Sequence, residues 1–135
     1  MSYSDIVATI AMIVAIIAVP ASGVVSYHYA IKGERRKEFN AIADPIRLKL
    51  HEHLRHIEHD IYPSGDYIQI SRRDYDSLID VSYHRDRKSL RLLCSKYEDA
   101  LAGSIVFDGG GNYKVLSFVE AKKVLSEILI LIERK

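Results

Sequence analysis

The first quarter of the chain is an uninterrupted apolar segment, and this segment constrains the fold more than any other feature. Between Ile6 and Val25, 16 of 20 residues are apolar, and no Asp, Glu, Lys or Arg occurs from Ile6 to Ile31. A helix of 20 residues is about 30 Å long, which matches the hydrocarbon thickness of a bilayer. We therefore predict a single transmembrane helix over residues 6–29.

The residues that flank this segment predict its orientation. Residues 1–5 contain Asp5 and no Lys or Arg, whereas a basic cluster follows the apolar segment directly. Lys and Arg are enriched on the cytoplasmic side of membrane helices, and tyrosine rings favour the interface. We expect residues 1–5 outside the cell and the remainder of the chain in the cytoplasm. The predicted juxtamembrane anchor comprises Tyr27, Tyr29, Lys32, Arg35, Arg36 and Lys37.

Two other interpretations of the apolar segment are less favoured. A cleavable signal peptide normally carries a basic n-region, which is missing here, and its positive charge precedes the apolar run. A buried helix of a soluble protein would have to be surrounded on every face by a chain of only 135 residues.

Small side chains recur along one stripe of the predicted membrane helix, at spacings of 3 and 4 residues. They are Ala8, Ala11, Ala15, Ala18 and Ser22. Such a stripe lets two helix backbones approach closely in lipid, so it predicts self-association or docking on another membrane helix. The alternative is that alanine is only a common filler in membrane helices.

The residues after the membrane helix predict a helical connector over 30–44 and a cytoplasmic helical domain over 45–135. Asp44 and Pro45 are a suitable N-cap and first residue of a new helix, with a bend at Asp44. That helix has an apolar stripe and reaches a turn at residues 62–66, after which residues 67–70 are partly β-like. The stripe comprises Ile46, Leu50, Leu54, Ile57 and Ile61.

Three further helical or hairpin segments follow. Ser71 and Asp74 predict a capping box for a short helix with Tyr75, Leu78 and Ile79 inward, and a longer helix closes at Gly103. Its inward residues are Leu90, Leu93, Cys94, Tyr97 and Leu101. Residues 105–107 and 113–116 flank a glycine-rich loop and predict a β-hairpin.

The last predicted helix begins with a capping box at Ser117 and Glu120 and runs through Arg134. Its inward residues are Ala121, Val124, Leu125, Ile128, Leu131 and Ile132. Val119 and Ile130 lie off this stripe, so we expect them to form a surface that another protein covers. The predicted fold class is therefore mainly α, with a single-pass transmembrane helix, a small helical domain and one short hairpin.

A histidine-rich stretch at residues 51–59 is the most conspicuous polar feature. Glu52, His56 and His59 share one helix face, and imidazole with carboxylate is plausible zinc or nickel chemistry. A structural site needs four ligands, and the remaining ligands are not apparent. A solvated helix face is favoured, and a pH-responsive surface is a further alternative.

Basic residues gather at Arg72, Arg73, Arg85, Arg87 and Lys88. They could bind the phosphates of lipid headgroups or of nucleic acid, although nucleic acid is disfavoured because no aromatic platform accompanies them. Aspartates interleave with these residues, so a self-compensating solvated face is the favoured interpretation.

No catalytic group emerges from the sequence. Cys94, the only cysteine, falls on an inward stripe where thiols are normally inert. The glycines at 109–111 lack the lysine and hydroxyl residue of a phosphate-binding loop. We expect no cofactor, no metal and no small-molecule substrate.

The sequence therefore predicts a non-enzymatic, membrane-tethered interaction protein that self-associates through its membrane helix and presents a helical domain to a protein partner. The alternatives are a membrane-anchored binder of anionic ligands and a metal-binding protein or enzyme that uses the histidine-rich helix. The layout resembles that of small single-pass proteins of bacterial inner membranes, which implies that location. This is a similarity of architecture and carries no residue roles.

Overall fold

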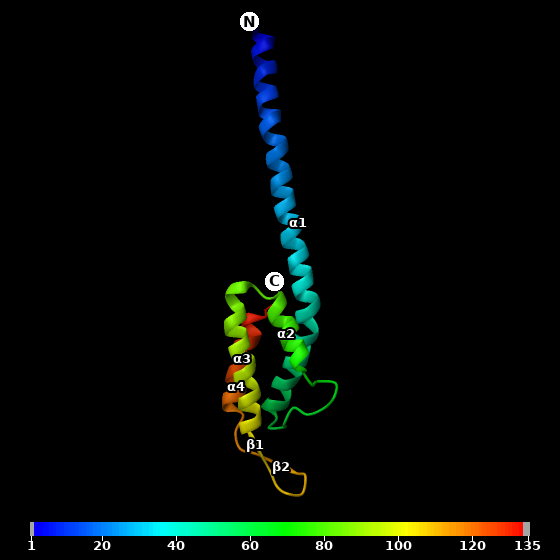
Figure 1. Cartoon of the computed structure of the whole chain (residues 1–135), viewed down its shortest axis with the longest axis vertical. Helices are drawn as coiled ribbons and strands as arrows, with labels where there is room; N and C mark the ends of the chain where they lie inside the picture. The colour runs from blue at the N-terminus through cyan, green and yellow to red at the C-terminus, as the bar shows by residue number, and fades with distance from the viewer. Residues whose placement is uncertain (1, 134–135) are drawn as a thin grey trace. The chain divides into compact units, whose positions relative to one another are not determined.

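The computed structural model describes residues 2–133 and places them in four helices and one two-stranded antiparallel sheet (Figure 1). The elements are α1 (Tyr3–Glu58), α2 (Arg72–Val81), α3 (His84–Gly103), β1 (Ile105–Phe107), β2 (Tyr113–Val115) and α4 (Val119–Leu131). The chain divides into two compact units, Met1–Lys37 and Glu38–Lys135. The mainly helical class with one small hairpin is confirmed.

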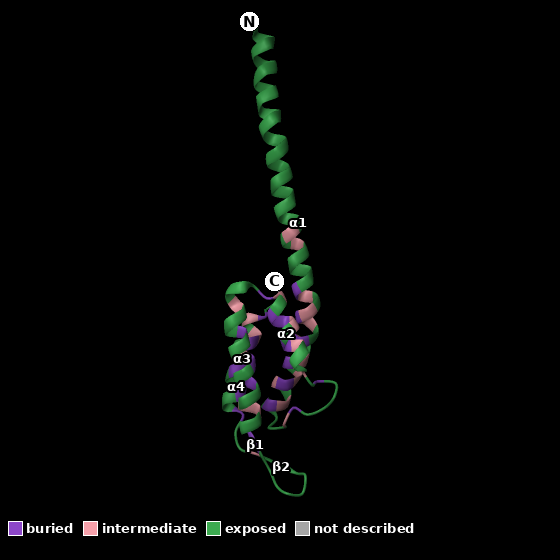
Figure 2. Ribbon diagram, viewed as in Figure 1, coloured by how far each residue is buried: buried purple, intermediate pink, exposed green. Residues whose placement is uncertain are grey.

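The first unit is the N-terminal part of α1. Within the described residues, α1 is the one helix long and apolar enough to cross a membrane. None of its most apolar 18-residue window is buried by the rest of the chain, as Figure 2 shows. Apolar side chains are exposed on every face of this segment, for example Ile10, Ala15 and Ile16, so the described part of the chain leaves them uncovered.

The predicted start of a new helix at Asp44 is wrong, because α1 continues through Pro45 to Glu58. Pro45 lies on the exposed side of α1, while the buried stripe runs on without interruption from Phe39 and Ala43 to Leu50. An interior proline costs about 3 kcal/mol. Burial of a large apolar side chain returns about 1.5–3 kcal/mol each, so the stripe outweighs the proline. Asp44 pairs with Arg47 one turn later.

The second unit has its core where residues 39–57 of α1 pack with α2, α3 and α4. Leu50, Leu78, Leu125 and Ile128 are fully buried, and most predicted inward residues belong to this core. Ile61 does not, because α1 ends at Glu58 and leaves Ile61 in the following loop with 48% of its surface exposed.

The expectation of a partly β-like segment at residues 67–70 is also wrong. These described residues form a turn in which the N–H groups of Ile68 and Gln69 donate to the carbonyl of Gly65, at 3.1 and 3.0 Å. Gly65 has φ 146°, and a Cβ there would lie 3.0 Å from the Tyr67 ring, so the turn requires glycine. Ile68 is buried and attaches the loop to the domain.

The two predicted capping boxes have different outcomes. The box at Ser71 is confirmed, with the Asp74 N–H donating to Ser71 Oγ at 3.1 Å and the Ser71 N–H donating to Asp74 Oδ2 at 2.9 Å. The box at Ser117 is wrong, because α4 begins at Val119 with Phe118 as N-cap. Phe118 is buried and draws the start of the helix inward.

α4 ends at Leu131, and the predicted end at Arg134 lies outside the described residues. The hairpin is confirmed, with Ile105 opposite Val115. Asp108 Oδ1 accepts the N–H groups of Gly110 and Asn112, so a carboxylate occupies the inside of the glycine-rich loop.

Candidate functional site

The predicted small-residue stripe and juxtamembrane anchor both lie in exposed positions of α1. Ser22 Oγ donates to the Val19 carbonyl at 2.8 Å, and Thr9 Oγ1 donates to the Asp5 carbonyl at 2.8 Å. These hydroxyls are thus satisfied by their own helix, which is the arrangement that an apolar surrounding requires. Lys32, Arg35 and Arg36 expose their charges after the apolar segment.

An apolar groove lies between α1 and the C-terminal end of α4. It has a volume of about 700 Å³, and its apolar lining is formed by Leu48, Leu129 and Ile130. Leu48 and Ile130 are 66% and 72% exposed. Asp44, Arg47, His51 and Glu133 supply the polar rim. The groove is a concave apolar surface with charged edges, a composition found at protein interfaces.

Polar contacts fix the two walls of this groove. Arg47 Nε donates to the Ile132 carbonyl at 3.1 Å, and the Arg47 guanidinium also pairs with Asp44. Farther along the same two helices, Lys122 Nζ of α4 lies 3.6 Å from Glu58 Oε1 of α1. The second unit's part of α1 and α4 therefore run antiparallel. The Arg47 guanidinium thus satisfies the carbonyl of Ile132, the residue that caps the C-terminal end of α4.

The predicted partner surface is only partly assembled. Ile130 lines the groove, whereas Val119, although 77% exposed, lies eleven positions earlier on α4 and outside it. Eleven residues correspond to about 16 Å along a helix, so the two side chains do not form one small patch. Leu48, which was not predicted as part of this surface, lines the groove with Ile130 instead of Val119.

In the described residues, the histidine-rich stretch does not bring three metal-ligating side chains together. Nδ1–H of His56 and of His59 each donates to the backbone carbonyl four residues earlier, at 2.8 Å. Across residues 2–133, no group of three or more His, Cys, Asp or Glu side chains is placed to hold a metal ion. Glu52 pairs with Arg55 at 3.1 Å.

The important histidine of this stretch is His53, which sequence reasoning missed. It is 6% exposed, and its Nε2 lies 2.9 Å from the Ile68 carbonyl while its Nδ1 lies 2.8 Å from the Tyr97 hydroxyl. A carbonyl can only accept, so Nε2 carries the proton and Nδ1 accepts from Tyr97. Burial lowers the pKa of His53, against the raising effect of the Ile68 bond, so the imidazole is neutral at pH 7.

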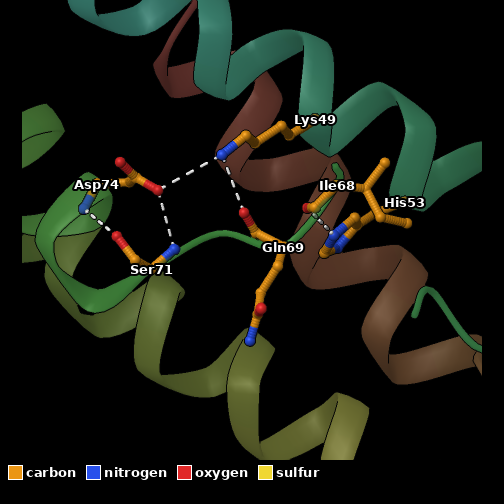
Figure 3. A network of polar contacts seen from close by, with 6 residues as sticks. All are labelled: Lys49, His53, Ile68, Gln69, Ser71 and Asp74. Atoms are coloured by element: carbon orange, nitrogen blue, oxygen red, sulfur yellow. Dashed lines mark hydrogen bonds and ion pairs between the residues drawn. The ribbon is translucent and has the colours of Figure 1, made fainter. Parts of the chain in front are cut away.

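A network of polar contacts around His53 fastens the loop and α2 to α1 (Figure 3). Lys49 Nζ donates to the Gln69 carbonyl at 2.9 Å and lies 3.6 Å from Asp74 Oδ2. The hydrogen bond from the Ser71 backbone lowers the pKa of Asp74, which is therefore a carboxylate at neutral pH. One turn of α1 thus holds the loop at Ile68 and at Gln69.

The structure does not bring the basic residues into one face. Arg72 and Arg73 begin α2, whereas Arg85, Arg87 and Lys88 begin α3, and these two helix starts lie at opposite ends of α2 (Figure 1). A ten-residue helix separates them by about 15 Å. Arg87 donates to the carbonyls of Asp80 and Ser82, so its guanidinium caps the end of α2.

Cys94 is buried, as the sequence indicated, and burial together with the charge of Glu98 raises its pKa to about 12. A thiol in this state is a poor nucleophile at neutral pH.

Comparison with protein-family models, with curated proteins and with solved structures gives no match for this chain. Its function is therefore inferred from its own residues.

Proposed function

We propose that this chain is a non-enzymatic, membrane-tethered interaction protein. Residues 6–29 of α1 cross a membrane, and the unit that begins at Glu38 presents the groove between α1 and α4 to a protein partner. The observation that carries the proposal is that the apolar window of α1 is unburied by its own chain, while residues 38–135 have a core of their own.

The proposed topology follows from charge. Lys32, Arg35, Arg36 and Lys37 are exposed directly after the apolar segment, where they would meet anionic headgroups of a cytoplasmic leaflet. The folded unit is then cytoplasmic and the N-terminus lies outside. A bacterial inner membrane fits this arrangement. The anionic-ligand alternative loses its geometric basis in the folded unit, because its basic residues are divided between two helix starts.

Membrane extraction tests the tether. The full chain is expected to remain in the membrane fraction after washing with alkaline carbonate and to be released by detergent. A chain that begins at Glu38 is expected in the soluble fraction, because it lacks the apolar segment. Recovery of an uncleaved full chain as a soluble monomer without detergent would contradict the proposal. A chain shortened by cleavage near Ala21 would identify the apolar segment as a signal peptide instead.

Self-association through the membrane helix is a separate part of the proposal. The double substitution Ala15→Leu, Ala18→Leu places large side chains in the small-residue stripe. It is expected to lower self-association at least severalfold in a membrane two-hybrid assay, because the two helix backbones can no longer approach closely. The matched control Ile13→Leu, Ile16→Leu changes residues off the stripe. Equal loss in both variants would rule out the stripe as the contact.

The partner surface is tested by a photo-crosslinking amino acid at Ile130. In native membranes it is expected to give a discrete protein adduct, since Ile130 lines the groove. The matched control is the same amino acid at Leu92, an apolar side chain of α3 that is 56% exposed. Adducts at both positions, or at Leu92 alone, would show that the groove is not the docking surface.

A further inference from the structure

A cavity separate from the groove lies where the loop after α1 passes over α2 and α3. It has a volume of about 330 Å³, within the range of small-ligand sites. Its lining comes from four parts of the second unit: α1, the loop, α2 and α3. The side chains that decide its chemistry are His53, Tyr62, Asp66, Tyr75, Tyr97 and Glu98.

The inner wall of this cavity is aromatic and hydrogen-bonding. Tyr75 and Tyr97 are 6% and 1% exposed, and Tyr62 is half-buried with its ring 5.8 Å from that of Tyr113. Because the Tyr97 hydroxyl donates to His53 Nδ1, its oxygen keeps lone pairs that can accept a hydrogen bond. The polar atoms of His53 and Tyr97 already have partners within the protein, so a ligand that donates a hydrogen bond would add a contact to the Tyr97 oxygen.

The charge of the cavity has one sign. Of the described residues that line it, the charged ones are Asp66 and Glu98, both at its exposed rim, whereas Arg72 and Arg91 belong to a neighbouring pocket beyond Tyr75 and Glu98. The Glu98 charge raises the pKa of the buried Tyr75, after the larger effect of burial itself, so its field reaches the inner wall. Lys49, which acts on His53, has its ammonium engaged by Asp74 and by the Gln69 carbonyl.

Aromatic rings and carboxylates without a lysine or arginine are the surroundings that favour an organic cation. An anion would face two carboxylates, and a metal ion would lack a third ligand in the described part of the chain. We propose that this cavity binds a small organic ammonium ion, with Glu98 and Asp66 supplying the counter-charge and the tyrosines supplying the aromatic wall. This ligand site goes beyond the proposed function and depends on neither the membrane nor a protein partner.

Calorimetric titration of the full chain in a maltoside detergent tests the site. The probes are choline, n-butylammonium and 3,3-dimethylbutan-1-ol, the uncharged isostere of choline. At least one ammonium probe is expected to bind with a stoichiometry of one and at least tenfold more tightly than the alcohol, because only the cations meet the carboxylates. No saturable binding of either cation at 10 mM, or equal binding of choline and the alcohol, would overturn the proposal.

Charge-neutral substitutions locate the binding. Glu98→Gln is expected to lower the affinity for the ammonium probe about tenfold. Glu127→Gln, the same change at an exposed position of α4 outside the cavity, is expected to leave this affinity unchanged. Asp66→Asn, on an exposed loop, provides a second variant should Glu98→Gln alter folding, which circular dichroism would reveal. Unchanged affinity in the folded cavity variants would show that the cation binds elsewhere and would overturn the assignment.

Discussion

A soluble chain that begins at Pro45 is expected to be less stable than one that begins at Glu38 by about 3–5 kcal/mol or more. The shorter chain lacks Phe39 and Ala43, which are 5% and 0% exposed within the core. Loss of one buried phenylalanine side chain alone costs about 3–5 kcal/mol. Because small domains have a total stability of about 5–15 kcal/mol, the shorter chain keeps only part of its margin or unfolds. Urea unfolding followed by circular dichroism measures the difference.

A point variant separates packing from truncation. Phe39→Ala in the chain that begins at Glu38 is expected to lower the free energy of unfolding by about 3–5 kcal/mol. Leu48→Ala, on the same helix but 66% exposed, is expected to change it by less than about 1 kcal/mol. If the chains beginning at Glu38 and at Pro45 were equally stable, residues 38–44 would be a connector, as the sequence pattern at Asp44 indicated.

The pattern at Asp44 and Pro45 shows why helix-cap signals in the sequence predicted only part of the fold. Asp44 and Pro45 form a good helix start in isolation, yet the apolar stripe that passes beneath them belongs to one continuous helix. Ser71 and Ser117 make the same point, because only Ser71 keeps its capping box; buried Phe118 displaces the start of α4. Apolar periodicity, which reflects burial directly, predicted the core well, whereas cap signals are worth about 1 kcal/mol and yield to packing.

The candidate sites were predictable only where they depend on one helix. Exposure of Ile130 follows from the periodicity of α4, but its partnership with Leu48 depends on how α1 and α4 pack. His53 follows Leu50 by three residues and precedes Ile57 by four, so its spacing matched the buried stripe. Its polarity placed it instead with the solvated histidines, since the bonds to Tyr97 and Ile68 come from distant parts of the sequence.

Replacement of His53 is the second substitution with a large expected effect. His53→Leu removes the partner of the Tyr97 hydroxyl and of the Ile68 carbonyl, and an unpaired buried polar group costs about 1–3 kcal/mol. The unfolding free energy of the chain that begins at Glu38 is therefore expected to fall by about 2 kcal/mol or more. His59→Leu, at an exposed position near the end of the same histidine-rich stretch, provides the control and is expected to cost less than about 1 kcal/mol.

The same histidine is expected to make stability depend on pH. In the unfolded chain His53 binds a proton with a pKa near 6.5, whereas burial lowers its pKa in the folded chain. Below pH 6.5 the unfolded state therefore binds more protons, so stability falls on acidification until the folded pKa is reached. The slope attributable to His53 is at most about 1.4 kcal/mol per pH unit.

Urea midpoints at pH 8, 6.5 and 5.5 measure this slope. Lys49 and His56 of α1 also lower the pKa of His53, and the Tyr97 hydroxyl of α3 faces its Nδ1. Asp74 has a pKa lowered from 3.8, so its contribution is lost only at lower pH and outside this window. His53→Leu is expected to flatten the slope and His59→Leu to retain it. An unchanged slope in the His53 variant would show that other groups produce the acid sensitivity, because a neutral buried imidazole must resist protonation until the fold opens.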